Sequence, residues 1–234
     1  MSRAPVILLP PSEGKATGGR GAPWQPGDGI LPELDQARNE VLAALARAGQ
    51  DVRTEPTLPA VERFTGVLYR ELDVPSLSAA GRRRLHATTL VLNGLMGVSG
   101  TRDPLPDHRL KLSVALAPLG RIATWWRPRL TEALGPRLAR RVVWDLLPGE
   151  HAAAWDPRQV SVARRITIRF VTADDRTVSH WNKLLKGAVV RHVVETGLTD
   201  PRGLVDLDHP AGYRFDARAS DLGDDVAAVV MRAT

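Results

Sequence analysis

The sequence predicts a mixed α/β fold: one compact domain, residues 1–234, with a mixed sheet flanked by helices and a basic cleft at the strand ends. Three observations support this prediction. Short continuous apolar runs bounded by turn residues are typical of buried strands. Amphipathic helical patterns lie between these runs. No repeat, low-complexity segment or linker divides the chain, and its 234 residues suffice for one substantial core.

Five segments are predicted to be strands. Residues 6–9 form an apolar run that two prolines end, which predicts a buried central strand. Residues 166–170 alternate between apolar and polar, which indicates a half-exposed strand. In chain order the predicted strands are residues 6–9, 88–92, 142–147, 166–170 and 226–231.

Helices are predicted from start and stop signals and from apolar spacing. Residues 32–49 begin with proline, carry apolar residues on one face and end with glycine. Pro128 starts a helix that ends at Gly135, and the clearest helix spans residues 180–196. Shorter helices are expected at residues 64–72 and through the triple arginine at 82–84, the latter capped by Ser76 or Ser78. The long glycine- and proline-rich loop at 10–29 is expected to be functional or disordered.

Composition excludes several classes of protein. The chain has no cysteine, which excludes disulfides, thiolate metal sites and cysteine nucleophiles. Its six histidines lack ligand spacing, so we expect no metal and no cofactor. The N-terminus lacks a secretory pattern and no stretch is long enough for a membrane span, so we expect a cytoplasmic protein with no membrane partner.

The charge balance favours an anionic partner. The formal net charge is +6 and the isoelectric point is about 10.4, which points to nucleic acid, nucleotides or phosphorylated metabolites. A solvated surface explains any single arginine cluster equally well. These clusters are Arg82 to Arg84, Arg127 with Arg129, Arg137 with Arg140 and Arg141, and Arg164 with Arg165.

Lysine is scarce among the 32 cationic residues. Only Lys15, Lys111, Lys183 and Lys186 are lysines, and the rest are arginine. Lysine is a compact ammonium whose pKa shifts on burial, whereas arginine is a fixed planar group that stays charged. Two interpretations stay open: these lysines serve sites that need an amine, or they are what an arginine-rich composition leaves by chance.

The loop after the first predicted strand carries the first candidate site. Ser12 supplies a hydroxyl, Lys15 an ammonium, and Gly14 permits close backbone approach, at the strand end where α/β sheets bind ligands. It is no phosphate loop, because Leu9 stands where the first glycine should be and Ala16 follows the lysine. The loop is predicted to bind an anion or substrate; the alternative is a plain strand-exit turn.

A second candidate site lies on the helix at 180–196. Lys183 and Lys186 flank Gly187, which removes side-chain bulk at about 1 kcal/mol relative to alanine and leaves room for a ligand or another backbone. The alternative is a solvated lysine face with Gly187 serving helix packing.

Three further segments carry weaker signals. Asn93, Gly94 and Gly97 form a glycine-punctuated turn that could grip phosphate, as hairpins between helices do in DNA-binding modules. Glu150 follows the third predicted strand and could act as acid or base. Tyr213 could carry a proton near the C-terminus, with core packing as its alternative.

A set of ordered segments carries a family resemblance. They are LLPPSEGK at 8–15, FTGVLY at 64–69, LNGLMGV at 92–98, HRL at 108–110, Trp126, WDLLPGEHAAAW at 144–155, SHWNKLLKG at 179–187 with Arg191, and GYRFD at 212–216. Together they resemble the YaaA family of bacterial peroxide stress resistance proteins, nearly end to end.

The resemblance implies a single α/β domain with a positively charged cleft, a helix-hairpin-helix-like element and affinity for DNA. It also implies a role in limiting oxidative damage linked to intracellular iron. Carried over by position, it assigns these residues to the shared cleft: Ser12, Lys15, Thr65, Gly66, Gly94, Gly97, Arg109, Lys183, Gly187, Arg191, Gly212 and Tyr213.

Two functions are therefore predicted, with a third, plainer alternative. The first is a peroxide-stress protein whose cleft grips DNA phosphates with little sequence preference. The second is an enzyme acting on a small anionic substrate, with Lys183 or Lys15 as the amine, Glu150 and Tyr213 as proton carriers and Arg109 as the anion clamp. The third is an interaction protein whose cleft residues only pack. The candidate binding residues are Ser12, Lys15, Thr65, Tyr69, Asn93, Gly94, Gly97, Arg109, Lys183, Lys186, Gly187 and Arg191.

Overall fold

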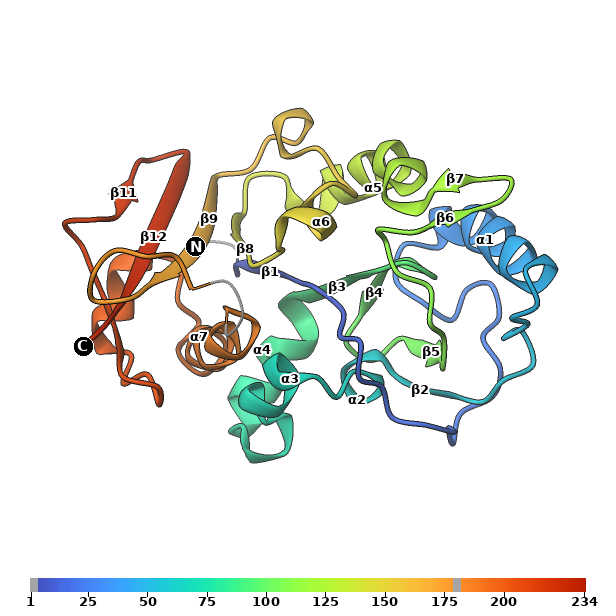
Figure 1. The fold of residues 1–234 in the computed structure, drawn as a ribbon, viewed down its shortest axis with the longest axis horizontal. Coiled ribbons are helices and arrows are strands. Elements are labelled where there is room, and N and C mark those ends of the chain that lie inside the picture. Colours follow the sequence, from blue (N-terminus) through green and yellow to red (C-terminus); the bar gives the residue numbers. More distant parts are fainter. Residues whose placement is uncertain (1–3, 179–181) are drawn as a thin grey trace.

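A mixed eight-stranded sheet forms the centre of the computed structural model, which describes residues 4–178 and 182–234 except for the side chains of residues 182–184 (Figure 1). In spatial order its strands are β10 (Tyr213–Phe215), β12 (Val226–Ala233), β9 (Arg164–Val171), β8 (Val142–Asp145), β1 (Val6–Leu9), β3 (Thr89–Asn93) and β4 (Gly97–Gly100), and β11 (Asp221–Leu222) also pairs with β12. The predicted mixed α/β fold is confirmed.

The five central strands, from β12 to β3, are parallel, and the outer strands pair antiparallel. β1 lies between β3 and β8. The chain runs from β1 to β3 on one side and returns later to form β8 on the other side. This makes the carboxyl ends of β1 and β8 a topological switch point, the place where loops diverge and leave a crevice. All four residues of β1 are buried, as its unbroken apolar sequence predicts.

Helices and two small sheets complete the fold. α3, α4 and α7 pack together, and Figure 1 shows them grouped on one side of the main sheet. The α-helices are α1 (Asp35–Arg47), α2 (Ala60–Arg63), α3 (Val67–Leu72), α4 (Ala79–Thr88), α5 (Ile122–Leu138), α6 (Gly149–Ala152) and α7 (Asn182–Thr196). The 3-10 helices are η1 (Pro32–Leu34), η2 (Val74–Ser76), η3 (Pro157–Gln159) and η4 (Pro201–Asp206), and the small sheets pair β2 (Thr57–Pro59) with β5 (Pro104–Pro106) and β6 (Ala115–Leu116) with β7 (Gly120–Arg121).

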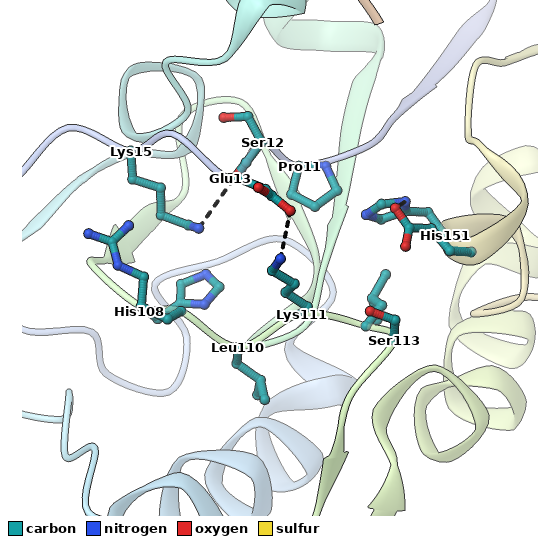
Figure 2. Close-up of a pocket in the computed structure, with 12 residues that line it drawn as sticks. Pro11, Ser12, Glu13, Lys15, His108, Leu110, Lys111, Ser113 and His151 are labelled. Atoms are coloured by element: carbon teal, nitrogen blue, oxygen red, sulfur yellow. Dashed lines mark hydrogen bonds and ion pairs between the residues drawn. The ribbon is translucent and has the colours of Figure 1, made fainter. Parts of the chain in front are cut away.

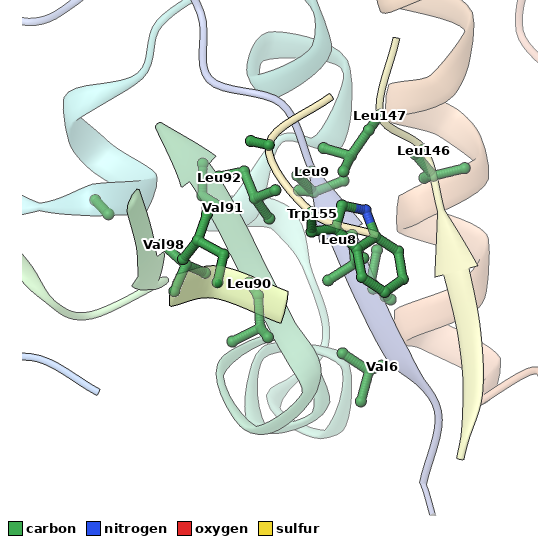
Figure 3. Close-up of a cluster of buried hydrophobic side chains, with 14 of the residues drawn as sticks. Val6, Leu8, Leu9, Leu90, Val91, Leu92, Val98, Leu146, Leu147 and Trp155 are labelled. Carbon is green, nitrogen blue, oxygen red and sulfur yellow. The ribbon is translucent and has the colours of Figure 1, made fainter. Parts of the chain in front are cut away.

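The core is built around the switch point. Side chains of β1 and β3 pack with those that follow β8, and Trp155 closes over them (Figure 3). Trp155 is 1% exposed. The loops that leave β1 and β8 therefore start from a rigid base, which is what a precisely placed site needs.

The predicted strands all form, and one helix prediction is wrong. α5 begins at Ile122 rather than at Pro128 and continues through Gly135 to Leu138, with Pro128 and Pro136 inside it. Pro128 lacks the N–H that continues a helix, but tertiary packing outweighs that loss. Trp126 in this helix is fully buried and donates its ring N–H to the carbonyl of Gly94, 2.9 Å away.

Two other predictions change in detail. The predicted helix at 64–72 begins only at Val67, because Phe64 forms a bridge with Lys15 and Thr65 donates its backbone N–H to Gly14. The turn at 93–97 joins two antiparallel strands, β3 and β4, and not two helices. The predicted turn therefore forms, but its setting differs from the helix hairpins with which its phosphate binding was compared.

Candidate functional site

A cavity of about 300 Å³ opens at the carboxyl ends of β1 and β8, where the topology places the crevice (Figure 2). Its walls come from three segments far apart in the sequence. They are the loop after β1 (Pro11, Ser12, Glu13 and Lys15), the stretch from His108 to Ser113, and Glu150 with His151 after β8.

The loop after β1 is held in one conformation by its own contacts and by the segment at 64–69. The Ser12 hydroxyl donates to the carbonyl of Gly14 at 2.5 Å and accepts the backbone N–H of Gly66 at 3.0 Å. The buried hydroxyl of Tyr69 donates to the carbonyl of Pro10 at 2.8 Å. Ser12 and Tyr69 therefore shape the loop, and the Ser12 oxygen is already engaged. Thr65 is exposed beside Gly14.

Lys15 is the half-buried amine of the cavity. Its Nζ donates to the carbonyl of Ser12 at 3.2 Å and lies 5.8 Å from the centre of the Phe64 ring. Burial lowers the pKa of Lys15, and the nearby Arg109 guanidinium lowers it further. A lysine in this setting is neutral more often than a surface lysine, so it can act as an amine as well as a charge.

His108 is a buried imidazole whose side chain faces the same space as Lys15 (Figure 2). It is 3% exposed, and neither ring nitrogen has a hydrogen-bond partner among the described residues. Burial lowers its pKa to about 3, and the charges of Lys15, Arg63 and Arg109 add to that shift. An unsatisfied buried polar group costs about 1–3 kcal/mol, which a ligand in the cavity would relieve.

The remaining walls carry charges of both signs. Lys111 and Glu13 form an ion pair at 2.6 Å that joins two walls of the cavity (Figure 2). Arg109 lies 3.7 Å from Asp107, and Glu150 lies 3.4 Å from the His151 ring. The lining thus holds three cations and two carboxylates, so the cavity itself is polar and only weakly cationic.

Lys186 reaches the base of the same loops from α7. Its Nζ, in a side chain 6% exposed, donates to the carbonyl of Leu146 at 2.9 Å, just after β8. Burial lowers the pKa of Lys186 to about 8, and the nearby Asp145 carboxylate opposes that shift. Lys186 supports the β8 loop but does not line the cavity. Lys183 is the first candidate catalytic amine from the sequence, and its side chain lies outside the described residues.

The turn at 93–97 supports the cavity from behind. Asn93 holds the turn by accepting the backbone N–H of Met96 at 2.8 Å, and the whole turn is buried. A Cβ at Gly94 would lie 2.5 Å from the carbonyl oxygen of Leu110, so only glycine lets the 108–113 wall approach this closely. Gly97 is buried against Trp126. These residues do not face the cavity.

Four predicted site residues lie elsewhere. Gly187 lets α7 meet α3, since a Cβ there would come within 2.5 Å of the Leu68 carbonyl oxygen. Arg191 donates to the carbonyls of Leu72 and Asp73 and to Ser76, capping the end of α3. Tyr213 and Gly212 belong to the β10 edge, and three strands, or about 19 Å of sheet, separate β10 from β1.

The sequence pattern assigns no role to His108. A single histidine in an irregular segment has no periodicity that would reveal its burial. The available signal is its place in the HRL segment that contributes to the family resemblance, next to the predicted anion clamp Arg109.

The described part of the chain also bears on metal binding and on membrane insertion. Residues 4–178 and 182–234 hold no group of three or more histidine, aspartate or glutamate residues arranged to bind a metal ion. Within the same residues, every helix is too short or too polar to cross a bilayer.

Comparison with known proteins gives a consistent result. A family model described as peroxide stress protein YaaA matches residues 7–219. A UPF0246 protein of Streptomyces coelicolor is 38% identical, with 93% of this chain and 94% of the relative aligned. A UPF0246 protein of Corynebacterium glutamicum is 30% identical over 80% of this chain and 83% of its own length. One from Cereibacter sphaeroides is 31% identical over 75% and 70%.

Proposed function

Because the chain belongs to the YaaA family of peroxide stress proteins, we propose that it acts in the peroxide response by binding a small anionic substrate in the switch-point cavity. The observation that carries this proposal is that Lys15, Arg109 and a buried His108, whose ring has no hydrogen-bond partner among the described residues, meet in one space of about 300 Å³. That volume is typical of a small-molecule site, and a neutral imidazole beside two cations suits an anion that also accepts a hydrogen bond.

The contacts of the arginine clusters favour the cavity over the arginine-rich surface as the site that binds the anion. Many of these guanidinium groups are committed to backbone carbonyls of the protein itself, so they hold elements together instead of standing ready for phosphates. Arg82 donates to Leu77, Arg84 to Val194 and Glu195, Arg141 to Ala4 and Pro5, and Arg164 to Leu222.

DNA is the second candidate ligand, and the net charge of +6 favours it. DNA binding would use exposed cations such as Arg83 rather than the cavity. The implied link to intracellular iron stays a prediction from the resemblance.

Thermal unfolding in the presence of each class of ligand tests the proposal. Inorganic phosphate, a nucleoside monophosphate, pyruvate and short duplex DNA are added separately to the wild-type protein. We expect at least one small anion to raise the unfolding temperature by about 5 °C near saturation, and Lys15→Met or Arg109→Gln to remove that rise.

Arg83→Gln is the matched control, because it removes an exposed cation that does not line the cavity. It should keep the small-anion effect. The proposal fails if DNA alone stabilises the protein and if that stabilisation survives Lys15→Met and Arg109→Gln but weakens with Arg83→Gln.

A further inference from the structure

Most polar groups of the cavity already have hydrogen-bond or ion-pair partners within the protein. This limits the groups that can react with a ligand or bind it. The Ser12 hydroxyl donates to the Gly14 carbonyl in its own loop and accepts the backbone N–H of Gly66, so it is no free nucleophile. The Lys111 ammonium is held by Glu13. The groups left to meet a ligand include the Lys15 amine, whose one described hydrogen bond goes to the Ser12 carbonyl, the exposed guanidinium of Arg109 and the ring of His108.

His108 can donate a hydrogen bond while carrying no charge. Burial keeps the ring neutral, the cations around it act in the same direction, and a neutral ring presents one N–H. A neutral imidazole N–H that faces a substrate polarises a carbonyl oxygen without giving up its proton. The oxygen that His108 meets is then a carbonyl oxygen or an oxyanion.

We propose that the substrate is a small carboxylate or phosphate that carries a ketone or aldehyde, and that Lys15 forms an imine with its carbonyl carbon. This rests on the proposed function, since Arg109 would hold the anionic group. Lys15 and His108 then approach opposite ends of the same carbonyl bond, the amine at carbon and the imidazole N–H at oxygen.

The step balances without a further reactant. The free amine of Lys15 forms a nitrogen–carbon bond, and the carbonyl π electrons move to the oxygen that His108 hydrogen-bonds. The oxygen then leaves as water with the two hydrogens the amine brought, and a carbon–nitrogen double bond remains. Desolvation of Lys15 leaves more of it as free amine at neutral pH, which favours the attack.

Reductive trapping tests the imine. The full-length protein is incubated with cyanoborohydride and, separately, with pyruvate, oxaloacetate or dihydroxyacetone phosphate, and intact mass and peptide maps are recorded. We expect one reduced adduct per chain on Lys15 with at least one of these probes. The chain has only four lysines, which makes the map unambiguous.

Variants define the controls. Lys15→Arg should abolish the adduct, and Lys111→Arg, which keeps the charge opposite Glu13, should keep it. His108→Gln should slow trapping about tenfold or more, as expected when an oxyanion donor is displaced. Lactate, which matches pyruvate but lacks the carbonyl, should slow trapping by competition and form no adduct.

The outcomes separate the two proposals. No adduct with any of the three probes, or adducts spread over all four lysines and unchanged by Lys15→Arg, would overturn the imine. If lactate or phosphate still stabilises the protein through Lys15 and Arg109, the anion site stands while the imine fails. If neither anions nor carbonyl compounds act through these residues, both proposals fail.

Discussion

His108→Leu is expected to stabilise the ligand-free protein by about 1–3 kcal/mol while abolishing anion binding in the cavity. The imidazole is 3% exposed and lacks described hydrogen-bond partners, so an apolar side chain of similar size suits the empty site better. Urea unfolding at neutral pH measures the stability, and the anion-dependent rise in unfolding temperature measures binding. A purely structural histidine would give the opposite sign, with loss of stability on substitution.

The same variant should change the pH dependence of stability. Burial lowers the pKa of His108 from its ordinary value of 6.5 to about 3 in the folded protein, so below about pH 6.5 the unfolded chain binds a proton that the folded chain does not. Stability is therefore lost as pH falls from 6.5 toward 3, and His108→Leu should flatten this decline. Equal slopes for the variant and the wild type over that range would refute the buried neutral state.

Asp145→Asn is expected to destabilise the protein by about 3–5 kcal/mol. The Asp145 carboxylate is nearly fully buried, accepts a hydrogen bond from Arg165 Nε at 2.8 Å and forms an ion pair with Arg165 Nη2 at 2.6 Å, with the Lys186 ammonium nearby. In the variant, no negative charge at position 145 balances the half-buried Arg165 guanidinium and the buried Lys186 ammonium at the end of β8. Urea unfolding of both proteins measures the difference.

Asp51→Asn provides the matched control for this prediction. Asp51 pairs with Arg53 at 2.6 Å, but both side chains are about half exposed and water replaces the lost contact. Its unfolding curve should overlay that of the wild type. If Asp145→Asn behaves like this control, the buried charges at β8 do not hold the loop in the way proposed.

The strand ends could be predicted from the sequence because they depend on local patterns. An apolar run ended by two prolines fixes β1, and the chain that leaves its carboxyl end must carry Ser12 and Lys15 toward the ligand edge. Glu150 follows β8 by the same logic. Their meeting in one cavity required only that β1 and β8 be neighbours, and the structure pairs these two strands in parallel.

The rest depended on tertiary contacts that no local pattern encodes. Gly187 indicated close approach of a ligand or another backbone but not the partner, which is the carbonyl of Leu68. Gly94 was predicted to lie in a turn that could grip phosphate, but in the structure it leaves room for the carbonyl of Leu110. The family resemblance assigns Tyr213 to the shared cleft. The strand order instead places β10, which contains Tyr213, at the far edge of the main sheet. The burial of His108 results from the packing of segments distant in sequence, which gives it no signature in its neighbours.

Nitrogen-15 NMR of the His108 ring, assigned with His108→Leu, examines the ligand site most directly. The ring should be neutral throughout the range from neutral pH to mildly acidic pH, and one of its nitrogens should shift as pyruvate or inorganic phosphate is added. That shift should saturate with the same affinity as the rise in unfolding temperature. Ring signals that stay unchanged while the anion saturates the protein would show that the anion binds elsewhere and that the switch-point cavity is not its site.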